Sequence, residues 1–114
     1  MKILYFDMEF ANGQVPGSIY SMGYLLTDEN FKILIPQTDL LIAPDCAWNE
    51  YVEHKILAYP KEEVESAPLF PAVYDKIKSL FDEAEIAVGF AAGRHLSRHD
   101  KRLCSNASRV MMLA

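Results

Sequence analysis

The sequence lacks several features, and each absence excludes a class of protein. Its two cysteines, Cys46 and Cys104, lie far apart without a C-x-x-C pair, so we expect neither a zinc site nor a disulfide framework. No apolar run approaches the length of a membrane span, and the chain starts with a strand-like segment instead of a basic leader. We therefore expect a cytoplasmic protein with no membrane partner. The sequence also contains no internal repeat and no low-complexity linker.

Basic residues are scarce over most of the chain. Up to Gly93 there are six lysines and arginines against fifteen aspartates and glutamates, a net charge of −9, whereas the residues after Gly93 carry +4. An acidic body repels a phosphate backbone unless metal ions or a local basic patch intervene. Any contact with nucleic acid must therefore come from a specific site.

The composition is that of one soluble globular domain, with 114 residues, 51% of them hydrophobic and 24% charged. We expect strands over 2–10 and 19–26, a third strand over 31–35 and 40–42 that is interrupted at Pro36, a short helix within 44–57, a helix over 71–83 and a strand over 86–90. Short links between the first three strands favour an antiparallel meander. A meander followed by a helix and a strand predicts an α/β domain with a mixed sheet.

Two carboxylates stand two residues apart in the first predicted strand, in the sequence Y-F-D-M-E. Alternate strand residues share a face, so Asp7 and Glu9 lie side by side. Their repulsion is costly unless a cation neutralises it, and Mg²⁺ or Mn²⁺ prefers such oxygen ligands. Two ions about 4 Å apart activate a water and stabilise the leaving oxygen of a phosphodiester. D-x-E alone is also typical of a solvated strand end, but its place before a meander favours a metal site.

These elements resemble the DEDD-type 3′–5′ exonuclease family, including proofreading exonucleases of the DNA polymerase III epsilon type. F-D-M-E-F is similar to the family's first motif, I-Y-S-M-G-Y-L-L-T-D to its second strand, A-P-L-F-P-A-V-Y-D-K-I-K-S-L-F to the helix before its second motif, and I-A-V-G-F-A-A-G to the entry of that motif. The likeness covers residues 1 to about 93. It implies a ribonuclease H-like fold.

The resemblance also implies roles for four residues. Asp7 would bridge two Mg²⁺ or Mn²⁺ ions, and Glu9 would bind one of them and orient the attacking water. Phe10 and Ala11 would lie against the terminal nucleotide. The implied partner is the 3′ end of a nucleic acid, DNA or RNA, and the implied reaction is phosphodiester hydrolysis.

The pattern breaks after Gly93. The family's second motif has an aspartate where this chain has His95, and its third motif lies further downstream than Ala114. We interpret 1–93 as the N-terminal part of an exonuclease-like domain and 94–114 as an atypical basic tail, with the C-terminal part of the fold missing. We hypothesise a frameshift at this point, because one choice of codons for the stretch after Gly93, read one base later with two A bases restored, gives Gly-Asn-Asp-Ile-Tyr.

Three functions follow from these observations. The first is a metal-dependent 3′–5′ exonuclease-family protein that is weakly active or inactive, because two carboxylates of four hold the metals weakly. The second is an inactive ribonuclease H-like binding or assembly module that forms homo-oligomers through an exposed edge. The third is a small metal-binding protein unrelated to nucleic acid.

Overall fold

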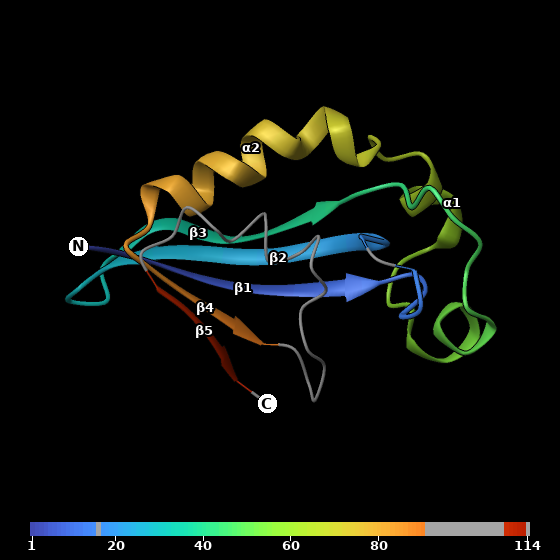
Figure 1. The fold of residues 1–114 in the computed structure, drawn as a ribbon, viewed down its shortest axis with the longest axis horizontal. Coiled ribbons are helices and arrows are strands. Elements are labelled where there is room, and N and C mark those ends of the chain that lie inside the picture. The colour runs from blue at the N-terminus through green and yellow to red at the C-terminus, as the bar shows by residue number, and fades with distance from the viewer. Residues whose placement is uncertain (16, 91–108, 114) are drawn as a thin grey trace.

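Strand β1 (Lys2–Phe10) lies inside a five-stranded sheet of order β3-β2-β1-β4-β5 (Figure 1). The computed structural model describes the backbone of residues 1–15, 17–90 and 109–113 and the side chains of residues 1–15 and 17–89. The other elements are β2 (Ile19–Asp28), β3 (Ile33–Leu41), a π-helical turn η1 (Val52–Ile56), α1 (Lys61–Glu65), α2 (Phe70–Glu83), β4 (Ile86–Phe90) and β5 (Arg109–Leu113). Among the described residues, no helix has the length and apolar character of a membrane span.

The strand pairing is mixed, as the sequence predicts. β1 pairs antiparallel with β2, and β2 pairs antiparallel with β3. β1 also pairs in parallel with β4, which returns to the sheet after α2. The meander, the helix and the further strand are therefore confirmed, and β1 is bonded on both of its edges.

Helix α2 covers one face of the sheet (Figure 1). Its residues Val73, Ile77, Leu80 and Phe81 recur at helical spacing and are buried against the strands. The Phe81 ring meets the edge of Phe6 from β1, with ring centroids 5.0 Å apart and planes at 76°. Complete burial of a side chain of this size contributes roughly 1.5–3 kcal/mol.

A second, smaller cluster lies beyond the end of β1. Its buried members are Ala11, Tyr20, Val52 and Val64, which come from the end of β1, from β2, from η1 and from α1. Trp48 packs against this cluster, and its ring lies 5.3 Å from that of Tyr20. The cluster therefore fastens the segment between β3 and α2 to the sheet.

Three details differ from the sequence prediction. β3 continues through Pro36 instead of breaking there, because β3 is an edge strand and its register shifts near that residue. Helix α1 was not predicted, since its five residues are too few to show a period. Arg109–Leu113, within the predicted atypical tail, forms a strand parallel to β4. The predicted boundary at Gly93, and His95, lie outside the described residues.

Candidate functional site

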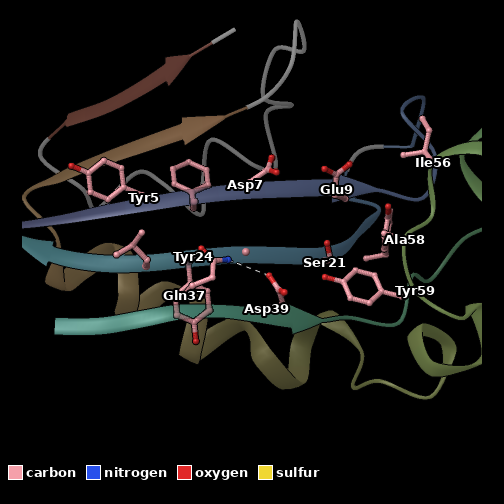
Figure 2. A pocket seen from close by; sticks show the side chains of 14 residues that line it. Tyr5, Asp7, Glu9, Ser21, Tyr24, Gln37, Asp39, Ile56, Ala58 and Tyr59 are labelled. Carbon is pink, nitrogen blue, oxygen red and sulfur yellow. Dashed lines mark hydrogen bonds between the residues drawn. The ribbon is translucent and has the colours of Figure 1, made fainter. Parts of the chain in front are cut away.

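Asp7 and Glu9 lie on the face of β1 that α2 does not cover. Alternation along the strand directs Leu4 and Phe6 into the core beneath α2, while the carboxylates point the other way. Both line one pocket, and Figure 2 shows them side by side on β1. The prediction that they share a face of an interior strand is confirmed.

A third carboxylate reaches the same pocket from β3. Asp7 is paired with Gly23 on β2, and Gly23 is paired in turn with Asp39, so the three residues form one row across the sheet. A Cβ atom at Gly23 would lie 3.1 Å from Asp39 Oδ1. Glycine therefore leaves the space in which the Asp39 carboxylate lies, and the Gln37 amide donates a hydrogen bond to it at 3.3 Å (Figure 2). Sequence reasoning missed Asp39, because only the strand register brings it near Asp7.

The pocket has a volume of about 400 Å³. Its floor is formed by the strands, and the end of η1 with the segment after it forms a wall through Ile56, Ala58 and Tyr59 (Figure 2). The described lining residues are Tyr5, Phe6, Asp7, Glu9, Tyr20, Ser21, Gly23, Tyr24, Leu25, Gln37, Asp39, Ile56, Ala58 and Tyr59. None of these is a lysine, an arginine or a histidine, so the described lining is acidic and aromatic.

A β-bulge directs Tyr20 into this pocket. The pairing of β1 with β2 passes from Glu9–Ser21 to Phe10–Ile19, which leaves Tyr20 without a partner in the register. Ile19 packs in the core beneath α2, whereas the next two residues both line the pocket. Bulges turn side chains in this way next to functional sites.

Burial and negative charge act together on the groups in the pocket. The pKa of Tyr20 is raised to about 12, mainly by desolvation and further by the charges of Glu9, Tyr59 and Asp7. Desolvation also raises the pKa of the Asp7 carboxyl group. The pKa of Tyr59 is raised by desolvation first and then by Asp39, which acts as a negative charge and as a hydrogen-bond acceptor. The pocket therefore favours protonated or cationic groups.

Two buried hydroxyl groups in this pocket have no hydrogen-bond partner among the described residues. Ser21 is 5% exposed and Tyr20 is 2% exposed, and both line the pocket. Ser18, which is equally buried, shows the usual arrangement, because its hydroxyl donates to the Asn12 carbonyl at 2.6 Å and accepts from the Asn12 N–H. Buried hydroxyls without a partner are costly, so the two in the pocket are suited to a ligand.

Phe10 and Ala11, predicted to contact a nucleotide, lie at the end of β1. Phe10 is half-buried and packs against the core beneath α2. Ala11 is fully buried in the second cluster, its N–H donates to the Ser18 carbonyl, and its own carbonyl accepts from the Asn49 N–H. Both placements favour packing, and the predicted contact with a nucleotide stays a prediction.

Asp7 and Glu9 supply the oxygen donors that Mg²⁺ and Mn²⁺ prefer. Within the described ranges, no three histidine, cysteine, aspartate or glutamate side chains come close enough to hold one ion. The two carboxylates on β1 therefore fit a divalent cation only as part of a site, with the other positions left to water or substrate. We expect two carboxylates alone to bind a divalent cation weakly.

The two buried serines provide a matched test of the unpartnered hydroxyl. We expect Ser18→Ala to lower the free energy of unfolding by about 1–3 kcal/mol, because it leaves buried backbone groups without their partner. Ser21→Ala is expected to leave it unchanged or to raise it by up to about 1 kcal/mol. Urea denaturation measures both, and an equal loss in the two variants would show that Ser21 has a partner.

The raised pKa of Tyr20 makes stability depend on alkaline pH. The folded state holds the Tyr20 proton more tightly than the unfolded state, so stability present below pH 10 is lost as the pH rises towards 12. Tyr20→Phe should remove about 2–3 kcal/mol of this loss. Urea denaturation at several alkaline pH values measures it. An alkaline loss of the same size in both chains would contradict the assignment.

The fold is similar to that of known exonuclease structures. No protein-family model and no curated protein matches the sequence, but solved structures do. E. coli exonuclease I in complex with a dA16 oligonucleotide is 18% identical, with a TM-score of 0.63 over 78% of this chain. A product-bound exonuclease I is 16% identical, with a TM-score of 0.62 over 81%. A full-length 3′-exonuclease is 16% identical, with a TM-score of 0.53 over 82% of this chain and 46% of its own.

The chain spans about a fifth of exonuclease I, since the alignments cover 20% and 22% of that protein. Identities this low report on architecture alone. The matching part is the mixed sheet with strand order β3-β2-β1-β4. The chain therefore has the ribonuclease H-like fold of the exonuclease domain of E. coli exonuclease I, as the sequence motifs predict.

Proposed function

We propose that this protein is a metal-dependent 3′–5′ exonuclease-family domain that binds nucleic-acid 3′ ends and has an incomplete catalytic site. The observation that carries the proposal is the position of Asp7 and Glu9, side by side on the interior strand of a ribonuclease H-like sheet. The structural neighbours support it, since one is an exonuclease in complex with an oligonucleotide.

Asp7 and Glu9 are the residues that would hold Mg²⁺ or Mn²⁺. A bound divalent ion would supply charge neutralisation and Lewis acidity at a phosphodiester. The raised pKa of Asp7 fits this role, because a desolvated carboxylate gains most when a cation neutralises it. Without a cation, the acidic pocket would repel the phosphates of a nucleic acid. We therefore expect binding of nucleic acid to depend on the metal.

The number of donors limits the activity. Mg²⁺ dehydrates reluctantly and demands near-ideal octahedral geometry, so two carboxylates offset only part of its dehydration cost. Within the described residues no third acidic group completes the site. We propose that hydrolysis by this chain is weak or absent, although binding of metal and of 3′ ends is retained.

Manganese binding by matched variants tests the proposal. Asp7→Asn should weaken Mn²⁺ binding by about tenfold or more, because it removes one full ligand charge. Asp75→Asn, on the exposed surface of α2, should leave it unchanged. Calorimetry or electron paramagnetic resonance of Mn²⁺ measures the affinity. Equal affinities in the two variants would show that Asp7 is not a metal ligand.

The same variants test the proposal that the chain binds nucleic acid through the metal. A fluorescent single-stranded oligonucleotide should bind in Mn²⁺, and this binding should be lost with chelator and with Asp7→Asn. Incubation with a 3′-labelled oligonucleotide should release little or no label. Rapid metal-dependent release that Asp7→Asn abolishes would contradict the proposed incompleteness of the site. Binding unaffected by chelator would contradict the role of the metal.

The exposed edge of the sheet favours a second candidate function, an inactive ribonuclease H-like assembly module. Phe31, Ile33 and Leu34 precede or begin β3 and are 72%, 60% and 42% exposed. Among the strands that the structure describes, β3 pairs with β2 alone, so its other edge offers backbone groups for pairing with a second copy.

This alternative predicts a homodimer through β3. Ile33→Lys should dissociate it, because a charge on an edge strand opposes further pairing. Light scattering measures the mass, and Tyr51→Lys, a change at another exposed apolar position, is the control. A monomeric parent chain would remove the support for this candidate.

A further inference from the structure

The pocket on the face of the sheet opposite α2 contains, besides Asp7 and Glu9 on β1, the carboxylate of Asp39 on β3. Asp7 and Asp39 stand on strands separated by β2, so their Cα atoms are about 10 Å apart. Two carboxylates on separate strands can each pair with one nitrogen of a cation that carries separated nitrogen donors.

Neither carboxylate is neutralised within the described part of the chain. None of the ion pairs found there involves Asp7 or Asp39. The polar neighbours of Asp39 are the Gln37 amide and the Tyr59 hydroxyl, which are uncharged donors. A cation between Asp7 and Asp39 would therefore find both charges available.

The two buried hydroxyls are an independent sign of a ligand. Ser21 and Tyr20 lie in the floor of the same pocket, 5% and 2% exposed, and neither has a hydrogen-bond partner among the described residues. Ser21 lies two residues from Gly23 on β2, the residue that pairs with both Asp7 and Asp39. A hydroxyl oxygen accepts a hydrogen bond from an ammonium or guanidinium N–H, so such a cation would satisfy both the charges and the orphaned hydroxyls.

The aromatic lining also favours an organic cation. Tyr5, Tyr20 and Tyr59 line the pocket together with the carboxylates. Alkylammonium and guanidinium groups are attracted to the faces of such rings, and their carbon atoms gain from apolar contact. A hydrated metal ion gains neither.

We propose that this pocket binds an organic cation with at least two nitrogen donors, of the polyamine or guanidinium class, held between Asp7 and Asp39 and hydrogen-bonded by Ser21 and Tyr20. This site does not depend on the proposed nuclease function. It requires neither a metal nor a nucleic acid. It also uses Asp39 and Tyr59, which are not among the proposed metal ligands.

Tryptophan fluorescence of the full chain in the presence of chelator provides the readout. Trp48 is the single tryptophan and its ring lies 5.3 Å from Tyr20, which lines the pocket. Putrescine and spermidine represent the polyamines, and agmatine represents the guanidinium class. 1,4-Butanediol, at matched ionic strength, is the neutral analogue of putrescine. We expect a saturable change with the cations and none with the diol.

Three variants assign the site. Asp39→Asn should raise the dissociation constant by about tenfold or more, the effect of one hydrogen bond to a charged group. Ser21→Ala should raise the dissociation constant about threefold without loss of stability. If Asp39→Asn does not fold, the Ser21→Ala variant tests the site alone. Asp75→Asn removes an equal charge from the exposed surface of α2 and should change nothing.

The outcomes separate this inference from its alternatives. A response to polyamines alone or to agmatine alone supports the site and identifies the source of the cation. Equal weakening by Asp39→Asn and Asp75→Asn would show general attraction to an acidic surface and would overturn the proposal. An unsaturable response, or an equal response to 1,4-butanediol, would overturn it as well. Since no metal or oligonucleotide is present, these results do not depend on the exonuclease proposal.

Discussion

The two faces of β1 carry opposite chemistry, and the rest of the structure depends on that division. One face places Leu4, Phe6 and Met8 beneath α2, where burial stabilises the fold. The other face carries Asp7 and Glu9, which no helix of the described residues covers. Because strand residues alternate strictly, the packing that fixes the apolar face also fixes the carboxylates. A slip of one residue would bury both charges, so hydrophobic packing maintains the geometry of the site.

Local patterns in the sequence were sufficient to predict much of the fold. The spacing of Asp7 and Glu9 predicted one face, and the helical period in 71–83 predicted α2, which spans Phe70–Glu83. The strand after it was predicted as 86–90, the same bounds as β4. These elements are long or strongly periodic, so the signal is contained within each segment. Their order then indicated a mixed sheet.

The rest of the site depends on contacts that no local pattern records. Asp39 comes near Asp7 only through the register of β3 on β2, and Gly23 makes room for it. Tyr59 reaches the pocket because the second cluster fastens the segment around η1 to the sheet. Pro36 was interpreted as a break because the sequence does not show that β3 is an edge strand.

The β-bulge at Tyr20 has a consequence for how such a pocket can change. In a regular strand, neighbouring residues such as Tyr20 and Ser21 would point to opposite faces, but here both line the same cavity. One irregular residue thus supplies two adjacent functional groups without lengthening the strand. Substitution of Ser21 can alter the chemistry of the cavity while the apolar packing beneath α2 and in the second cluster stays intact, so ligand preference can diverge at this position independently of the fold.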